Sequence, residues 1–250
     1  MNRPDLTTLQ REHQPEQIRR RLAKGPRHSF LKDFIYGAID GAVTTFAIVA
    51  GVAGAGLSSG IVIVLGLANL IADGFSMAVS NFLGTRAEWQ EGQKARREEE
   101  EHIERYPEGE REEIRQIFAA KGFEGTQLEH IVETITADRA RWIDTMIQEE
   151  LGLPLNSPSA WRAGLVTFGA FILLGAIPLL PYFVNLVAAD FLRPFAFSAV
   201  MTGIAFFSVG ALKSRFVHQH WLVAGSETLG IGGVAAGIAF AIGAALGGIA

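Results

Sequence analysis

The chain has 250 residues, a formal net charge of −4 and 49% hydrophobic residues. Its basic residues are unevenly placed, because residues 34–85 and 216–250 contain no Lys or Arg. A soluble protein of this size needs polar faces on every element, so stretches of this kind indicate a chain whose solvent is lipid. The absence of cysteine excludes disulfides and thiolate metal sites. The charge balance gives no indication of nucleic-acid binding.

Five segments are long and apolar enough to cross a membrane, which takes roughly 20 apolar residues each. They cover residues 34–57, 60–84, 161–182, 195–212 and 221–250. The link from Gly54 to Gly60 is short enough only for a turn, so the first two spans are expected to form an antiparallel hairpin. Pro178 and Pro181 are expected to kink or end the third span. The predicted fold class is therefore all-α, with five transmembrane helices.

The positions of Lys and Arg predict the orientation of the spans. Residues 1–32 carry eight of them, residues 86–162 carry eleven, the link between the last two spans carries two, and the remaining link carries one. This alternation predicts a cytosolic N-terminus, a cytosolic segment at 86–158 and an outside C-terminus. The basic arm at 1–29 has no apolar core and is not expected to be a cleavable signal. Its residues 10–24 are helix-compatible, and they either lie on anionic headgroups or form a solvated tail.

An acidic segment at residues 88–156 separates the first two spans, within residues 30–87, from the last three, within 157–250. Residues 86–158 hold 18 of the 26 acidic residues of the chain. We expect a cytosolic domain of three helices, inserted between the second and third spans. Its helices are predicted at 88–105, 108–121 and 126–151.

Local signals place the ends of these three helices. The first continues the second span and stops at Tyr106–Pro107, because Pro cannot donate a backbone hydrogen bond. Gly122 is expected to close the second helix. Thr126 and Glu129 have the spacing of a capping box at the start of the third.

Ionisable residues inside the spans indicate function, because burying them in lipid is costly. They are Asp40, Asp73 and Glu227. Asn69, Asp73 and Met77 follow at intervals of four and share one helix face. Oxygen ligands with a thioether suit a transition ion such as Fe²⁺ better than Mg²⁺ or Ca²⁺. The alternatives are that Met77 fills packing space, that Asp40 and Asp73 pair with hydroxyls or amides, and that Glu227 reaches the membrane surface.

Three pairs in the acidic segment have helical spacing that places their members on one face. They are Glu99 with His102, Glu110 with Glu113, and Met146 with Glu150. Such pairs from several helices can form a carboxylate-rich metal site. Solvated helix faces remain the alternative. Small residues that allow close helix packing occur as Gly37 with Gly41, Gly233 with Gly237, and Gly243 with Gly247.

The residues resemble the vacuolar iron transporter family of plants, fungi, protists and bacteria over residues 30–250. The segments that carry the resemblance are Asp33–Gly41, Ala72–Ala78, Trp142–Leu153, Ile177–Tyr182 and Glu227–Gly233. The resemblance implies a five-helix homodimer that exchanges cytosolic Fe²⁺ for protons. It also implies a cytosolic three-helix domain that binds metal and supplies the pore.

The resemblance assigns the pore aspartate of the family to Asp40 and its methionine to Met77. A family glutamate falls on Asn69, which keeps an oxygen ligand but cannot carry a proton. Asp73, one turn on, can supply the lost carboxylate, so Asp73 and Glu227 are the candidates for a proton relay.

In the acidic segment the resemblance assigns family metal ligands to Glu99, Glu110, Glu113, Met146 and Glu150. His102 stands where the family has a further glutamate, and imidazole is also a good ligand for Fe²⁺. Fe²⁺ is the implied substrate, Mn²⁺ is a second candidate, and Zn²⁺ is a further candidate for the cytosolic domain.

Our hypothesis is a secondary active transporter, not an enzyme, that exports Fe²⁺ or Mn²⁺ from the cytosol in exchange for protons. Its expected partners are lipid, protons and a second copy of the chain, without nucleic acid; a two-fold axis beside the first two spans would double the pore ligands. Asn69 resembles the bacterial branch, which indicates a bacterial inner membrane, with a vacuolar membrane as the alternative. Two other functions are considered, a membrane-tethered ferroxidase and a metal sensor that transports nothing. A di-iron site prefers Glu-x-x-His on paired helices, and in the insert only Glu99 and His102 have this form.

Overall fold

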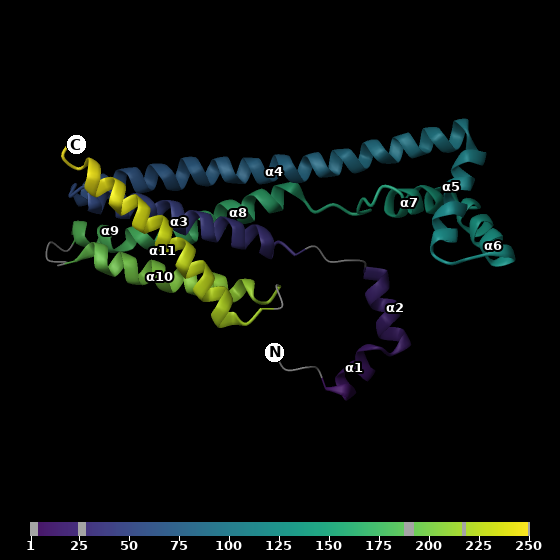
Figure 1. Ribbon diagram of the computed structural model, residues 1–250, viewed down its shortest axis with the longest axis horizontal. Coiled ribbons are helices and arrows are strands. Elements are labelled where there is room, and N and C mark those ends of the chain that lie inside the picture. The colour runs from purple at the N-terminus through teal and green to yellow at the C-terminus, as the bar shows by residue number, and fades with distance from the viewer. Residues whose placement is uncertain (1–4, 25–28, 188–192, 217–218, 250) are drawn as a thin grey trace.

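The computed structural model describes residues 5–24, 29–187, 193–216 and 219–249. Throughout these ranges the regular elements are helices, and no strand occurs in them (Figure 1). Five helices are long and apolar enough to cross a membrane. The predictions of an all-α fold and of five spans are confirmed.

The five spans lie close to the predicted ranges. They are α3 (Leu31–Gly54), α4 (Ser59–Arg105), α8 with η1 and α9 (Ala160–Gly175, Ile177–Leu179 and Leu180–Val187), α10 (Pro194–Lys213) and α11 (Trp221–Leu246). The prolines interrupt the third span as predicted, with a 3₁₀ turn at Pro178, but the span continues to Val187 beyond the expected end.

The link between α3 and α4 is a tight turn closed by glycine. Gly56 has a φ of 67°, a conformation that glycine adopts without steric cost. The Gly56 amide donates to the Ala53 carbonyl, and the Leu57 amide donates to the Val52 carbonyl. This pair of bonds is the Schellman motif, which satisfies the last carbonyls of a helix. It returns α4 beside α3, as the hairpin prediction required.

Helix α3 lies at the centre of the bundle and contacts α4, α8, α10 and α11. A Cβ on Gly41 would lie 2.4 Å from the Phe171 carbonyl oxygen of α8, and one on Gly243 would lie 2.0 Å from the Gly51 oxygen of α3. These glycines therefore let the backbones touch, as predicted. Gly233 and Gly237 differ, because nothing lies within 4 Å of a Cβ at either position among the described residues.

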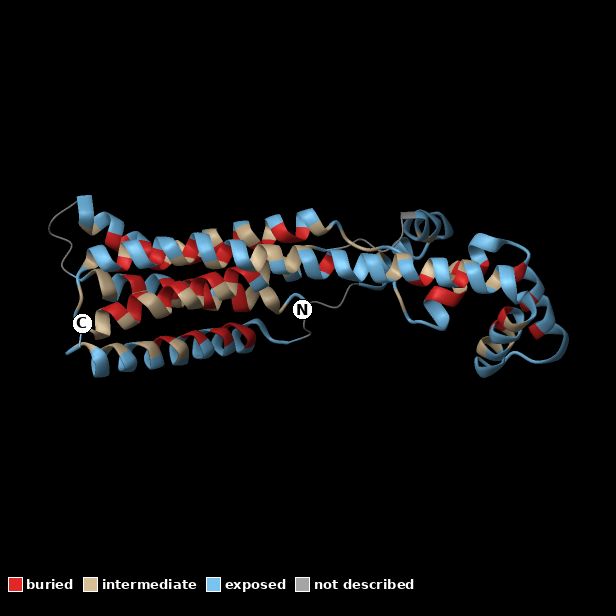
Figure 2. Cartoon of the chain, turned by 90° about the horizontal axis from the view of Figure 1, so that it is seen from above, coloured by how far each residue is buried: buried red, intermediate tan, exposed pale blue. Residues whose placement is uncertain are grey.

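Helix α4 is 47 residues long and extends well beyond the bundle (Figure 1). Its charged second half packs with α5 (Pro107–Ala120) and α7 (Arg139–Glu149), and α6 (Gly125–Thr136) packs on both of these. Figure 2 shows buried residues gathered inside the bundle and, separately, inside this unit of four helical segments. We call it the acidic unit. Its core contains Ile114, Leu128, Val132, Ile135, Trp142 and Met146.

Two local predictions for the acidic unit are wrong. The helix expected at 126–151 is two helices, because the chain breaks at Ala137 and restarts where the Asp138 side chain accepts a hydrogen bond from the Arg141 amide at 3.0 Å. The capping box is absent, since α6 begins at Gly125 without a side-chain cap. Gly125 has a φ of 55°, so a glycine turn replaces the predicted cap.

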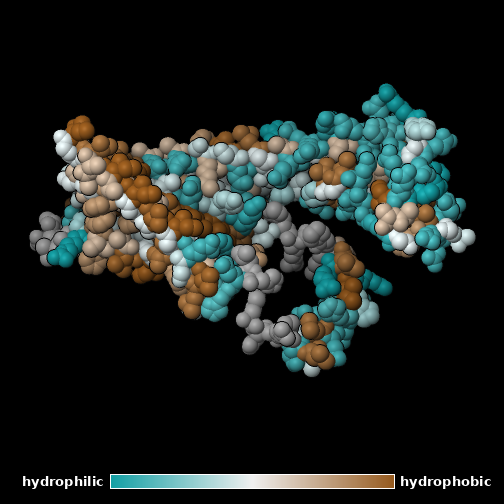
Figure 3. All heavy atoms as spheres, in the orientation of Figure 1, coloured by the Kyte–Doolittle hydropathy of each residue, from teal (hydrophilic) through white to brown (hydrophobic). Residues whose placement is uncertain are grey.

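The surface of the bundle and that of the acidic unit differ in hydropathy. Brown and tan side chains form much of the visible face of the bundle, with teal patches among them, whereas the acidic unit is mostly teal (Figure 3). The N-terminal arm forms α1 (Leu6–Glu12) and α2 (Pro15–Lys24), which lie apart from the bundle (Figure 1). Leu6 and Leu22 in this arm are exposed.

Candidate functional site

The acidic unit brings three potential metal ligands together. Glu99 and His102 lie one turn apart near the end of α4, and Glu110 lies in the first turn of α5. The reversal at Tyr106 places α5 beside α4, so that one ligand atom from each of Glu99, His102 and Glu110 lies within 4.8 Å of the others. His102 Nδ1 is 3.5 Å from a Glu110 carboxylate oxygen.

The two glutamates are buried without enough hydrogen-bond donors. Glu99 is 4% exposed and Glu110 is 6% exposed. One buried carboxylate oxygen of each lacks a hydrogen-bond partner among the described residues. Buried polar atoms are normally paired, and orphaned carboxylate oxygens beside an imidazole fit a divalent cation. The residues present therefore fit a metal ion.

Burial and mutual repulsion shift the protonation of these groups. Burial, and then the charges of Glu110 and Glu150, raise the pKa of Glu99 to about 7. Burial, and then the charge of Glu113, raise the pKa of Glu110. Burial, and then Glu113, also raise the pKa of Glu150. A cation would relieve this repulsion, so protons and metal compete for the same oxygens.

The remaining predicted ligands of this unit surround the trio. Glu113 and Glu150 are exposed, and the charge of Glu150 acts on both Glu99 and Glu110. Met146 is fully buried in the hydrophobic core. The structure thus groups the trio directly and puts the two exposed glutamates within electrostatic range. Met146 packs in the hydrophobic core, and its role as a ligand stays a prediction.

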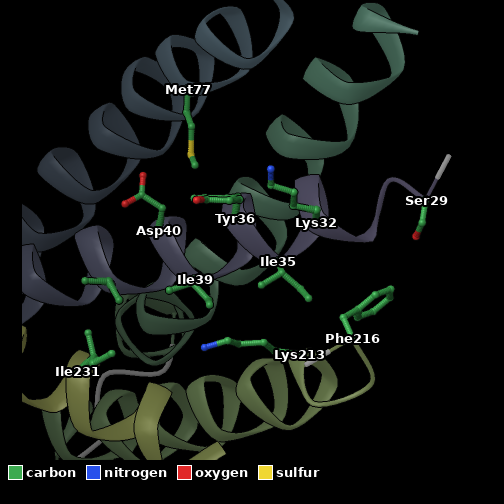
Figure 4. Close-up of a pocket in the computed structure, with 11 residues that line it drawn as sticks. Ser29, Lys32, Ile35, Tyr36, Ile39, Asp40, Met77, Lys213, Phe216 and Ile231 are labelled. Carbon is green, nitrogen blue, oxygen red and sulfur yellow. The ribbon is translucent and has the colours of Figure 1, made fainter. Parts of the chain in front are cut away.

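Within the bundle, Asp40 of α3 and Met77 of α4 line one cavity of about 870 Å³. Figure 4 shows both side chains on the same side of α3, with Tyr36 beside them. The rest of the lining is mostly apolar and comes from α3, α10 and α11. A carboxylate and a thioether on a cavity in an apolar bundle can bind a borderline transition ion.

Asn69 and Asp73 have different surroundings. The Asn69 amide donates to the Thr44 and Thr45 hydroxyls at 3.2 and 3.4 Å. Asp73 interacts electrostatically with Asp40. The structure therefore puts Asp73 within electrostatic range of Asp40. It ties Asn69 to α3, and the Asn69 oxygen accepts no hydrogen bond from a described residue.

Glu227 of α11 has a cationic partner that the sequence analysis missed. Lys213, at the end of α10, lies with its Nζ 3.6 Å from a Glu227 oxygen. Lys213 also lines the cavity that holds Asp40 (Figure 4). Lys213 and Arg215 are the basic residues of the link between the last two spans. A lysine at the end of an apolar span was the signal in the sequence that could have predicted a partner for Glu227.

The fold and these two groups of ligands define an integral membrane protein with candidate metal sites both inside the bundle and in a polar extension. The model of the VIT family matches residues 31–244, so the chain belongs to the VIT family.

Curated relatives cover most of the chain. It is 33% identical to vacuolar iron transporter 1 of Arabidopsis thaliana over 213 residues, which is 85% of this chain and 84% of the relative. It is 33% identical to the vacuolar iron transporter of Toxoplasma gondii over 225 residues, 87% of this chain and 74% of the relative. The vacuolar iron transporter of Plasmodium berghei is 32% identical over 223 residues, 86% of this chain and 82% of the relative.

Proposed function

We propose that this protein exports Fe²⁺ from the cytosol across a membrane in exchange for protons, with Mn²⁺ as a second substrate. The observation that carries the proposal is the shared cavity of Asp40 and Met77 inside a bundle of five apolar helices. A soft thioether beside a carboxylate favours Fe²⁺ over Mg²⁺ and Ca²⁺. The names of the relatives, vacuolar iron transporters, support the same substrate.

The acidic unit, within residues 88–156, captures the ion on the cytosolic side. The excess of Lys and Arg in residues 1–32 and 86–162 supports this orientation, because basic connections stay in the cytosol. Glu99, His102 and Glu110 hold the ion, and Glu113 and Glu150 add negative charge at the rim. Zn²⁺ is a further ion that this set of oxygen and nitrogen ligands suits.

Proton coupling rests on the carboxylates of the spans. A proton that reaches Asp40 or Asp73 from the acidic side neutralises a ligand and helps to release the ion. Glu227 is the third relay candidate, and its pairing with Lys213 lets it change partners when it is protonated. Asn69 contributes its oxygen as a ligand and carries no proton.

A homodimer supports this role, because one chain offers few ligands at the cavity. A two-fold axis beside α3 and α4 would double Asp40 and Met77. The membrane is either a bacterial inner membrane, as the resemblance of Asn69 to the bacterial branch indicates, or a vacuolar membrane, as the names of the relatives indicate.

Two measurements on purified protein separate transport from the other functions. A ferroxidase would consume oxygen on addition of Fe²⁺, whereas we expect no consumption above that of free Fe²⁺. A sensor would bind Fe²⁺ without moving it, whereas we expect Fe²⁺ to enter liposomes that contain the protein. Oxygen consumption, or binding without flux, would replace the transport proposal by the corresponding function.

A further inference from the structure

A second cavity lies on the route between the acidic unit and Met77. Its volume is about 410 Å³, and it shares Ser29, Lys32, Tyr36 and Met77 with the first cavity. Its lining differs, because six side chains that bear oxygen line this cavity and not the first. They are Asp33, Ser80, Asn81, Thr85, Glu88 and Thr167.

Asn81 joins three helices at this cavity. Its side-chain amide donates to the Asp33 carboxylate at 2.9 Å and to the Thr167 hydroxyl at 2.7 Å. The carboxylate must accept, so the amide hydrogens point to α3 and α8. The Asn81 oxygen accepts no hydrogen bond from any part of the chain that the structure describes, which leaves it available as a ligand.

Thr85 is an independent sign of a ligand. It is only 8% exposed, it lines the cavity, and its hydroxyl has no hydrogen bond within the described ranges. Its oxygen is not among the buried side-chain atoms that lack a partner, so it stays accessible at the cavity. An ion or its bound water in the cavity can therefore bond to it.

The charges on the lining favour a cation. Asp33 and Glu88 are negative, and neither has a basic side chain within 4.0 Å among the residues described. Lys32 also borders the cavity, so two formal negative charges face one positive charge. Carboxylate, amide and hydroxyl oxygens are hard ligands, which suit a divalent cation that keeps part of its water shell.

We propose that this cavity is a staging site for a partly hydrated divalent cation, held by Asp33 and Asn81 and, through water, by Thr85. The site rests on the proposed transport function. With a rise of 1.5 Å per residue, the Thr85 level lies roughly 21 Å along α4 from Glu99 and roughly 12 Å from Met77. The site thus lies between the acidic unit and Met77. Oxygen ligands would hold the ion there before it binds the Met77 thioether.

Counting bound Mn²⁺ by electron paramagnetic resonance tests the site. The full-length protein carries Glu99→Gln and Glu110→Gln to silence the acidic unit. We expect Asp33→Asn to remove one Mn²⁺ per chain and Lys32→Gln to tighten binding several-fold. The control is Ser208→Ala, which removes an exposed hydroxyl of α10 outside the cavity and should keep the Mn²⁺ count. If folded Asp33→Asn binds as many Mn²⁺ as its parent, the proposal is overturned.

Asn81→Asp provides a second arm that does not depend on Asp33→Asn folding. Two carboxylates would then face each other, so we expect a lower melting temperature in chelator and its recovery in Mn²⁺. A loss that Mn²⁺ does not restore would show a purely structural network and refute the site. Neither arm measures flux, so a failure of iron transport in the unmodified protein remains distinguishable from a failure of this site.

Discussion

Glu99 and Glu110 come from different helices and meet in the acidic unit, where one carboxylate oxygen of each lies within 4.8 Å of the other. Two buried carboxylates this close repel each other, and a proton on one of them relieves the repulsion. Each also keeps one buried oxygen without a hydrogen-bond partner among the described residues. The pair is therefore a site that takes up either a proton or a cation.

Metal binding by the acidic unit should strengthen with pH. Because the pKa of Glu99 is raised to about 7, an ion competes with a proton below that pH. A single group of this pKa gives roughly a tenfold gain in Mn²⁺ affinity between pH 6 and pH 8. Calorimetry at the two pH values measures it. Glu99→Gln should flatten the dependence, and an equally steep dependence in that variant would contradict the assignment.

The metal-free protein should respond to pH in the opposite direction. The folded state holds the Glu99 proton up to a pKa of about 7, whereas the ordinary pKa of a glutamate, which holds in the unfolded state, is 4.5. Between these values the folded state binds more protons than the unfolded state, so stability falls as pH rises. The melting temperature in chelator, relative to that of Glu99→Gln, should drop from pH 5 to pH 8. A constant difference between the two proteins would show that Glu99 is not perturbed.

Glu110→Gln should weaken metal binding without destabilising the protein. The change removes a buried carboxylate whose pKa is raised by burial and by the charge of Glu113, so the melting temperature at pH 8 in chelator should stay level or rise. Mn²⁺ affinity should fall at least roughly tenfold. Glu133→Gln is the matched control, since Glu133 is exposed on α6 of the same unit. Equal effects of the two substitutions on Mn²⁺ affinity would exclude Glu110 from the metal site.

Met77→Ala should abolish Fe²⁺ flux and leave a folded protein. It removes the thioether from the cavity that Asp40 lines. Met201→Ala is the control, because Met201 is an exposed methionine of α10. Flux in proteoliposomes and chromatographic profiles measure both. Flux by Met77→Ala that equals that of Met201→Ala would exclude the thioether from the route.

Alanine substitutions of two glycines on α11 should differ in their effect on stability, because only one of these glycines packs against another helix. Gly243→Ala would bring a Cβ to 2.0 Å from the Gly51 oxygen, so we expect destabilisation of about 1–3 kcal/mol. Gly233→Ala meets no atom within 4 Å of the described chain and should leave the melting temperature unchanged. Thermal unfolding of the two variants measures the difference. Equal melting temperatures would contradict the contact between α11 and α3.

The spans could be predicted because lipid imposes a simple rule on composition, and α3, α10 and α11 follow it closely. The break at Ala137 could not, because the helical pattern continues through it and the Asp138 cap becomes visible only when α7 turns away from α6. Glycine spacing alone did not distinguish Gly233 from Gly243, since both motifs look alike until the partner helix is known.

The sites, too, could be predicted from the sequence only where their residues lie on one helix. Spacing paired Glu99 with His102, but it could not bring Glu110 to them, because that contact depends on the turn at Tyr106. The Asp33–Asn81 contact was missed, although Asn81 follows Met77 by one turn and continues the polar face of α4. Its partners lie on other helices, which no single-helix pattern reveals.

The most direct test of the account is Fe²⁺ uptake by liposomes that contain the purified protein, with and without an acidic interior. We predict uptake that increases with the gradient and is lost in Asp40→Asn. No uptake under either condition, by protein that still binds Fe²⁺, would contradict transport. Uptake that ignores the gradient would contradict proton coupling.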